Sequence, residues 1–478
     1  MSNFSRLSSF LIVVGFCVLG ALLFWRLTES PPTWMDEGAI DQVAMNLAQK
    51  GIYGYQIAPR QFVSAEFLTT GYPVVYPVAL SFLIFGKSLF SARLVMVLFI
   101  FFLVVLAYWY SRMHDVSEDS LLLFPVFSLF LLISFAPLYG HGKNVLGEVP
   151  GFTFFLFSLL FLLLFERGYR ARWLPPAAGL LAGLSMATKP LYLVTILPAA
   201  LFTIFLFKRS ALSLKEKSLF FLGALIPLLW WLVVQSGSNS PLDVFSYGNP
   251  ERSAFLPLIV SNSLRFISES QPVYCLVLVL LWWIGVAIRK RGGIPISLAE
   301  SFALSFSVFN LLGFLTTRGF YRYLFPTEVL ALLFLPYALY CMIRLVWSPA
   351  RALHASFALL TVLIGFQTYL LFFHSWVSDS QTSTRAAMLT RELSVITPQQ
   401  SVFFYHVPEA VLFLPHDNYY QYLRFADTVE RGKEILPLLS EGKADFVLVD
   451  MRFSTSTIPL TAYQEKSHFD KYTLYEKK

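Results

Sequence analysis

The stretch GYPVVYPVALSFLIF, residues Gly71–Phe85, decides how the rest of the chain is arranged. It is apolar, but it is shorter than the roughly 20 residues that a membrane-spanning helix needs, and it contains Pro73 and Pro77. If this stretch crossed a membrane, every later loop would change sides. We predict that it does not cross and instead lies in the membrane interface as a juxtamembrane helix, because only this arrangement agrees with the charge pattern described below.

The composition indicates a membrane protein. Of the 478 residues, 56% are hydrophobic and only 14% are charged, whereas a soluble protein of this length is nearer one quarter charged. Besides residues 71–85, eleven apolar runs approach the length of a span. They are 10–27, 92–110, 121–138, 149–165, 174–188, 191–207, 218–235, 271–288, 298–316, 324–343 and 355–374. The sequence therefore predicts a polytopic α-helical membrane protein with about 11 spans.

The basic residues indicate how the chain is oriented. The net charge of +7 would suit a nucleic-acid partner, but Lys and Arg gather in short loops between apolar runs, so we predict no nucleic-acid binding. With residues 71–85 in the interface, these loops share the side of the N-terminus, which should then be cytoplasmic. We expect a plasma (inner) membrane protein with its C-terminal part outside the cytoplasm. The basic loops are 111–119, 166–173, 208–217, 289–293 and 344–354.

Two parts are expected from the change in composition along the chain. Residues 1–375 form the membrane part, and residues 28–90 within it form a first outer loop with juxtamembrane helices. From residue 376 the apolar runs shorten and charge rises, which predicts a small soluble α/β domain over 376–478 on the outer face. Its expected elements are helices over 382–396 and 428–440 and strands over 401–406 and 445–450.

Three acidic residues are candidates for catalysis. Asp36 and Glu37 are adjacent just after the first span, and Glu148 precedes Pro150 in the loop before the fourth span. A carboxylate at the membrane boundary is suited to act as a general base or as an ion ligand, since partial burial raises its pKa toward the working range. The alternative is structural, because acidic residues in the first turn of a helix complement its dipole.

Four residues that follow later in the chain are candidates for binding a phosphate. Lys189 lies between two apolar runs, where a charge is costly unless it is paired. Arg318, Tyr321 and Arg322 belong to the segment TRGFYRY between two spans, and arginine presents a planar fork that suits phosphate. The alternatives are snorkelling of the lysine and an aromatic belt with headgroup-binding arginines. All four residues share the predicted outer face with Asp36.

Together these residues favour transfer from a lipid-linked phosphate donor to a hydroxyl acceptor. The base would deprotonate the acceptor, and the cations would stabilise the departing lipid phosphate. The chain contains no GxxxxGK[ST] motif, which argues against a nucleotide-driven reaction. We assign no cofactor or metal ligand, because His141, His406 and His416 are scattered along the chain. Carboxylates are also ligands for divalent cations, so binding of such a cation remains an alternative.

The order of these motifs resembles the GT-C superfamily of membrane glycosyltransferases, and most of all its branch of protein O-mannosyltransferases and the lipid A aminoarabinose transferase. The resemblance rests on residues 34–53, 71–93, 140–150, 178–189 and 318–326. It implies transfer of a sugar from a polyprenyl-phosphate carrier with inversion at the anomeric carbon. It also implies that Asp36 is the base, Glu37 its acidic neighbour and Glu148 the acid of the second outer loop.

The same resemblance implies that Lys189 and Arg322 lie near the donor phosphate. Many relatives carry an arginine several residues before the acid of the second outer loop, and this chain has Lys143 there. We therefore include Lys143 among the expected phosphate-binding residues. Because this chain has a lysine in place of that arginine, the donor or acceptor contacts of the arginine do not transfer directly to Lys143.

Other functions remain open at this point. A transporter or flippase of lipid-linked glycans would place its charges inside its spans and would often show two matching halves. Here the candidate charges lie at loop junctions on one side, and the two halves do not match. A lipid-linked polymer ligase would use the same type of donor. A non-catalytic scaffold would not need converging acids and cations. The sequence names neither the sugar nor the acceptor, which is a lipid, a glycan or a protein.

Overall fold

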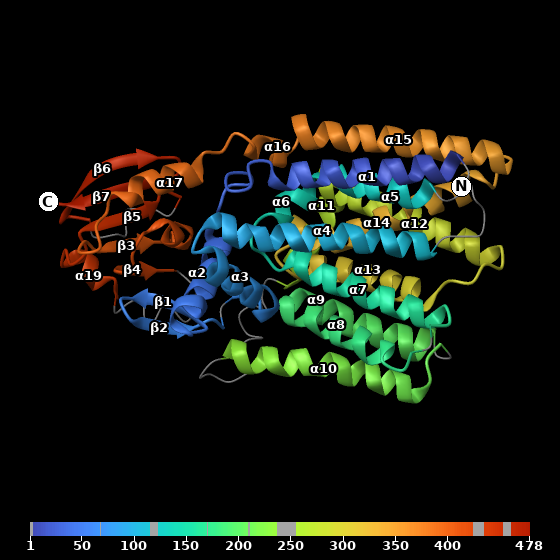
Figure 1. The fold of residues 1–478 in the computed structure, drawn as a ribbon, viewed down its shortest axis with the longest axis horizontal. Helices are drawn as coiled ribbons and strands as arrows, with labels where there is room; N and C mark the ends of the chain where they lie inside the picture. Colours follow the sequence, from blue (N-terminus) through green and yellow to red (C-terminus); the bar gives the residue numbers. More distant parts are fainter. Residues whose placement is uncertain are drawn as a thin grey trace.

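The structure, a computed structural model, describes residues 3–66, 68–114, 123–169, 171–208, 211–236, 255–423, 435–452 and 460–478. Long helices run roughly parallel and form a bundle, and a small β-sheet lies beyond one end of it (Figure 1). The N-terminus lies at the opposite end of the molecule from the sheet and the C-terminus. We call the end of the bundle that faces the sheet the domain side.

The bundle is formed by helices from both halves of the chain. Its helices are α1 (Asn3–Phe24), α4 (Leu89–His114), α5 (Phe124–Ile133), α6 (Ala136–Gly142), α7 (Glu148–Glu166), α8 (Leu174–Thr188), α9 (Pro190–Leu201) continued by a π-helix (Phe202–Phe207), α10 (Leu214–Ser236), α11 (Phe255–Ser268), α12 (Ser270–Arg291), α13 (Leu298–Thr316), α14 (Phe325–Ile343) and α15 (Pro349–Phe373). A short 3₁₀ helix, η5 (Tyr321–Tyr323), joins α13 to α14.

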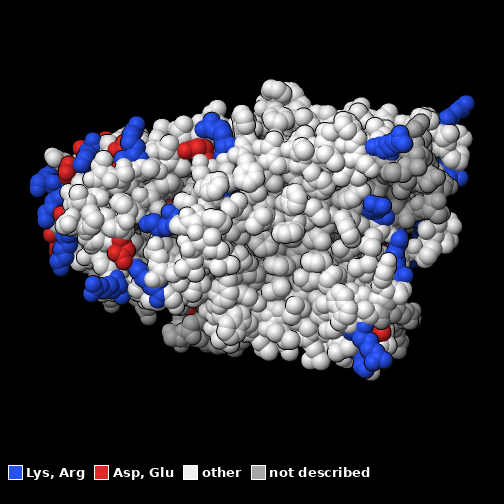
Figure 2. Space-filling model, viewed as in Figure 1, with Lys and Arg blue, Asp and Glu red and all other residues white. Residues whose placement is uncertain are grey.

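The number of candidate spans is close to the predicted number of about 11. Within the described residues, nine helices are long and apolar enough to cross a membrane, and α5 and α6, bent by 53° to each other, count as a tenth if the pair forms one span. The apolar helix α8 has only 15 residues and corresponds to the predicted run at 174–188. Figure 2 shows a nearly uncharged belt between two charged ends, as expected of an integral membrane protein. The predicted fold class is confirmed.

The first loop contains more structure than predicted. It folds into α2 (Met35–Lys50), a hairpin of β1 (Gly54–Ala58) and β2 (Gln61–Ser64), and α3 (Tyr72–Phe85). The sequence predicts helices here but does not reveal the hairpin, because its strands have only five and four residues. Helix α3 is the predicted short apolar helix, with 14 residues. Gly71 allows its start to lie against α8, because a Cβ atom there would overlap the carbonyl of Ala187.

The C-terminal sheet has five described strands in the order β4-β3-β5-β7-β6. The predicted strands are confirmed as β3 (Val402–Tyr405) and β5 (Phe446–Asp450), which pair in parallel, and β4 (Tyr419–Tyr422) is parallel to β3. The hairpin of β6 (Tyr463–Phe469) and β7 (Tyr472–Lys477) is antiparallel and was missed, because the interior of β6 is polar and exposed.

Helices cover part of this sheet. The helix predicted at 382–396 is confirmed as α17 (Arg385–Ser394), which follows the short α16 (Trp376–Ser380). The helix predicted at 428–440 falls partly on residues 424–434, which lie outside the described residues, and its end is α19 (Pro437–Ser440).

The sheet domain is fixed to the first loop through α2. The 3₁₀ helix η6 (Pro408–Phe413) lies so close to α2 that a Cβ atom at Gly38 would overlap the backbone of Glu409. Gln42 Nε2 donates to the hydroxyl of Tyr419 at 2.8 Å in the same interface. The helix that carries Asp36 and Glu37 is therefore held between the bundle and the sheet domain.

Candidate active site

The two adjacent acids at the start of α2 lie in different environments. Asp36 and Glu37 occupy the first turn of α2, which follows the extended residue Trp34. Successive residues of an α-helix point about 100° apart, so the two side chains leave the helix in different directions. The Asp36 side chain is 30% exposed, whereas that of Glu37 is completely buried. Only Asp36 is therefore accessible to a substrate.

Glu37 is held by Arg93, which lies in the first turns of α4. The guanidinium group donates from Nε and Nη2 to the two oxygens of Glu37 at 2.8 and 2.7 Å. Arg93 also donates to the carbonyls of Leu27 and Pro31 and to Asn144 Oδ1, each at 2.8 Å. This bidentate, fully buried pair connects α2 to the end of α1 and to the loop before α7. Its geometry is that of a structural anchor.

Asp36 belongs to a separate network of four charged residues. Arg322 Nη2 donates to Asp36 Oδ2 at 2.9 Å, and Arg322 Nε lies 3.1 Å from Glu148 Oε1. The ammonium group of Lys189 donates to the same oxygen of Glu148. Glu148 and Lys189 are buried, and the side chain of Arg322 is 11% exposed. The network thus runs from a buried Lys–Glu pair, through one arginine, to the accessible carboxylate of Asp36.

Local structure explains how these residues converge. Lys189 has an extended backbone between α8 and α9, so its side chain leaves the junction of the two helices. Glu148 is the first residue of α7, and the hydroxyl of Tyr192 in α9 donates to its backbone carbonyl. Arg322 comes from η5, and its guanidinium carbon lies 5.1 Å from the ring centre of Trp34. Each charge is therefore positioned by a helix end.

The electrostatics of the network keep Arg322 charged. Burial alone would lower the pKa of Arg322, but the carboxylates of Glu148 and Asp36 outweigh this effect and raise it above its ordinary value. One turn beyond Glu37, Asp41 is buried and neither carboxylate oxygen has a hydrogen-bond partner among the described residues. Burial, and next the charge of Glu37, raise the pKa of Asp41 well above its ordinary value.

The other predicted phosphate ligands lie outside this network. Arg318 is exposed, and the Tyr321 hydroxyl donates to Glu269 Oε2 at 2.5 Å, next to Arg265. Lys143 donates to the backbone carbonyl of Trp25 at 2.9 Å, on the side of α1. The structure thus brings together Asp36, Glu148, Lys189 and Arg322, keeps Glu37 in the adjoining anchor, and separates Lys143, Arg318 and Tyr321 from them.

Sequence reasoning did not identify Arg93 and Trp34 as functional positions. A signal for Arg93 was available, since it is a charged residue at the beginning of an apolar run, and such charges are normally paired. Trp34 carried no comparable signal, because an aromatic residue near the interface is expected in any membrane protein. Its position beside the network follows only from the contact of its ring with the guanidinium group of Arg322.

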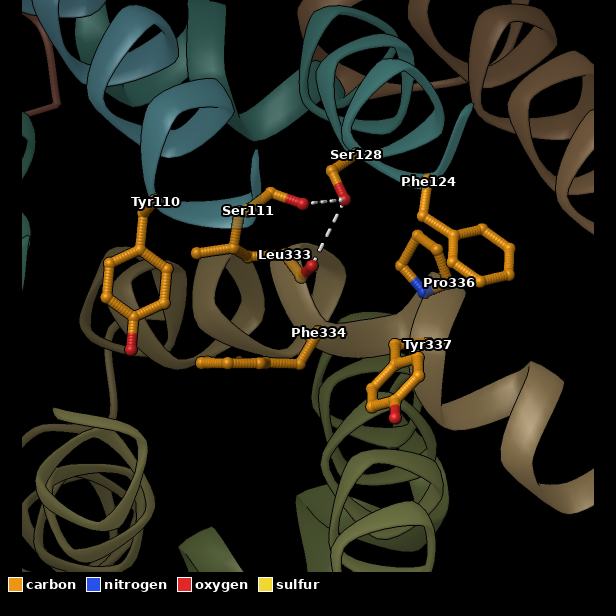
Figure 3. A pocket seen from close by; sticks show the side chains of 8 residues that line it. All are labelled: Tyr110, Ser111, Phe124, Ser128, Leu333, Phe334, Pro336 and Tyr337. Carbon is orange, nitrogen blue, oxygen red and sulfur yellow. Dashed lines mark hydrogen bonds between the residues drawn. The ribbon is translucent and has the colours of Figure 1, made fainter. Parts of the chain in front are cut away.

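A pocket toward the end of the bundle opposite the domain side is not connected with these charges. Figure 3 shows it between α4, α5 and α14, lined by aromatic rings and two serines. Pro336 lacks an N–H group, so it interrupts the hydrogen bonds of α14 there. The hydroxyl of Ser128 donates to the carbonyl of Leu333 at 3.1 Å, in the turn that precedes this proline. We interpret the pocket as a packing feature around the proline.

Metal ligands do not gather in the part of the chain that the structure describes. It contains no group of three or more His, Cys, Asp and Glu side chains that is suited to hold a metal ion. His141 instead packs against the ring of Trp376, with ring centres 5.0 Å apart.

Comparison with solved structures defines the class of fold. The chain shares its fold with solved structures of ArnT and of an archaeal oligosaccharyltransferase, in agreement with the resemblance seen in the order of motifs. ArnT from Cupriavidus metallidurans bound to undecaprenyl phosphate has a TM-score of 0.65 and 13% identity, and the match covers 97% of each chain. Its apo state gives a TM-score of 0.67 with 14% identity and the same coverage.

A second similar structure is the oligosaccharyltransferase of Archaeoglobus fulgidus, tethered to an acceptor peptide. It has a TM-score of 0.57 and 11% identity, and the match covers 98% of this chain and 74% of that one. At the level of sequence, no family model and no curated protein matches the chain. At these identities the similarity establishes the fold, and function has to be argued from the site.

Proposed function

We propose that the protein is a glycosyltransferase that moves a sugar from a polyprenyl-phosphate carrier to a hydroxyl group of an acceptor, with inversion at the anomeric carbon. The observation that carries this proposal is the partly exposed carboxylate of Asp36, ion-paired to Arg322 beside the buried Glu148–Lys189 pair. A base and a cation on one surface are what this reaction requires. The similar ArnT structure contains undecaprenyl phosphate, and another of the archaeal enzyme contains dolichol phosphate with an inhibitory peptide.

The residues then have distinct roles. Arg322 occupies Oδ2 of Asp36, so Oδ1 is the oxygen that accepts the proton of the acceptor hydroxyl. The acceptor oxygen attacks the anomeric carbon from the face opposite the phosphate, and the bond between that carbon and the phosphate oxygen breaks. The electron pair stays on the polyprenyl phosphate, whose growing charge is stabilised by Arg322. Glu148 and Lys189 hold Arg322 in place, and Glu37 fixes the start of α2.

The placement in the cell belongs to the same proposal. We propose a plasma (inner) membrane protein with its N-terminus in the cytoplasm, so that Asp36 faces the outer side. Residues 1–375 would then be the catalytic membrane domain. Residues 376–478 would be an extracytoplasmic domain, whose contact with α2 makes it a candidate cover for the acceptor.

The test is transfer by the purified protein in lipid vesicles. It is supplied with a panel of polyprenyl-phosphate sugars and a membrane extract as acceptor, and free polyprenyl phosphate and labelled acceptor are measured. Asp36→Asn should abolish both products, while Asp379→Asn, an exposed acid in α16, should leave them unchanged. Equal turnover by wild type and Asp36→Asn would refute the base assignment.

The same vesicles separate the rival functions. A flippase would move the intact donor across the membrane without releasing polyprenyl phosphate. A polymer ligase would accept donors that carry long glycans and reject single sugars.

A further inference from the structure

A narrow crevice lies on the edge of the bundle, between α1 and α15, and is separate from the network around Asp36. Its walls include Leu22 and Trp25 of α1 and Leu371 and Phe372 of α15. Figure 1 shows these two helices along one edge of the bundle, with α6 and α16 near their domain-side ends. The crevice is narrow and partly open to the surroundings.

The floor of this crevice carries one buried cation. Lys143, at the end of α6, is 4% exposed and is the one charged residue among those that line the crevice. Among the described residues its ammonium group donates one hydrogen bond, to the Trp25 carbonyl, and forms no ion pair. An ammonium group has three N–H donors, so two remain for a ligand.

A buried cation without a counter-ion is energetically costly, so such a group either loses its proton or gains an anionic partner. Burial, and next the charge of Arg93, lower the pKa of Lys143 to about 7, which means that a nearby anion would stabilise its charged form. The nearby Arg93 has its charge matched by Glu37, but no carboxylate among the described residues pairs with Lys143. An anionic group that reaches the ammonium would supply the missing charge.

The surroundings of the crevice indicate what carries that anionic group. The last turns of α1 and α15 present large exposed apolar side chains, including Phe24, Trp25 and Phe373. Such side chains face acyl chains when the helices cross a membrane, and Lys143 lies at the domain-side end of both helices, where headgroups are found. Phosphate is the anionic group that membrane lipids present at this depth.

We propose that the crevice between α1 and α15 binds the phosphate of a membrane lipid through Lys143, with the lipid chains lying along the two helices. This site is distinct from the proposed donor phosphate at Arg322, because Lys143 shares no described hydrogen bond or ion pair with Asp36, Glu148, Lys189 or Arg322. It does not depend on the proposed transferase activity.

The test counts lipids that stay bound when the full-length protein is released from vesicles into a native mass spectrometer. Vesicles contain phosphatidylcholine alone, or phosphatidylcholine with either phosphatidylglycerol or undecaprenyl phosphate. The matched control is Lys87→Met, since Lys87 also donates to a backbone carbonyl but lies on the side of α3. Lys143→Met should lower retention of the phosphate lipid at least about tenfold, and Lys87→Met should not.

A second variant, Leu22→Trp, controls for the case in which Lys143→Met fails to fold. Leu22→Trp fills the crevice from α1 and leaves the charge of Lys143 in place, and it should lose the same lipid. Retention of either phosphate lipid by wild type and its loss in both variants support the site, and the arm that binds identifies the lipid. Unchanged retention in Lys143→Met and Leu22→Trp, or complete displacement of the lipid by inorganic phosphate at equal concentration, would overturn the proposal.

Discussion

The two neighbouring acids of α2 should respond in opposite ways to the same chemical change. Asp36→Asn and Glu37→Gln each replace a carboxylate by an amide of nearly the same shape. In Glu37→Gln, the buried guanidinium of Arg93 loses its counter-charge, while the acceptor for the backbone N–H of Val145 is kept. Removing one partner of a buried ion pair costs about 3–5 kcal/mol. Since one hydrogen-bond acceptor remains, we expect about 3 kcal/mol.

Asp36→Asn should cost far less stability, because its pair with Arg322 is partly exposed. Arg322 is mostly buried, but it keeps its pair with Glu148 when the Asp36 charge is removed, so we expect a loss of about 1 kcal/mol. Turnover should show the reverse pattern. Asp36→Asn removes the proposed base and should be inactive, whereas Glu37→Gln should retain most of the turnover per folded molecule, since Glu37 is completely buried.

The assay combines thermal unfolding in detergent, followed by tryptophan fluorescence, with turnover normalised to the folded fraction from size-exclusion chromatography. A double variant, Glu37→Gln with Arg93→Gln, should lose less stability than the sum of the two single variants, because the unpaired charge is gone. If Glu37→Gln is as stable as wild type but inactive, Glu37 acts in catalysis and the anchor interpretation is wrong.

Three further outcomes are expected. Arg322→Lys should lower turnover about 10- to 100-fold, since the fork that contacts Asp36 and Glu148 is lost, whereas Arg318→Lys, an exposed control, should stay near wild type. Gly38→Ala should loosen the sheet domain, seen as faster proteolysis after residue 376, and Gly20→Ala, with open space around it, should not. The raised pKa of Asp41 means that the folded state holds a proton that the unfolded state releases above about pH 4. Stability should therefore fall as pH rises toward the raised pKa in wild type, and Asp41→Asn should flatten this slope in thermal unfolding.

The sequence was sufficient to predict the spans, because each span is a separate local signal. Length and apolar content identified them, and the short, proline-containing run forms the 14-residue helix α3. The hairpin of β1 and β2 and the strands β6 and β7 were missed. Strand β6 has a polar, exposed interior and is stabilised by pairing with β7, so its own residues carry little information.

The candidate site was only partly predictable for a related reason. Asp36, Glu148, Lys189 and Arg322 were identified because charges are rare in this chain, and each of them needs a partner. The sequence does not show which of these charged residues form ion pairs with one another. Lys143 and Lys189 look equivalent as isolated lysines near a membrane surface, yet one pairs with Glu148 and the other contacts only a backbone carbonyl among the described residues.

The division of roles between Asp36 and Glu37 depends on a residue that is distant in the sequence. Arg93 lies 56 residues after Glu37, and it holds Glu37 together with two carbonyls in the segment that follows α1 and with Asn144 before α7. These contacts fix the direction in which α2 begins, and the helical turn then directs Asp36 toward Arg322. The buried acid thus determines where the accessible acid lies, which is why a stability defect in Glu37→Gln should be accompanied by altered positioning of Asp36. A raised KM in that variant, at nearly unchanged kcat, is the expected sign of such a shift.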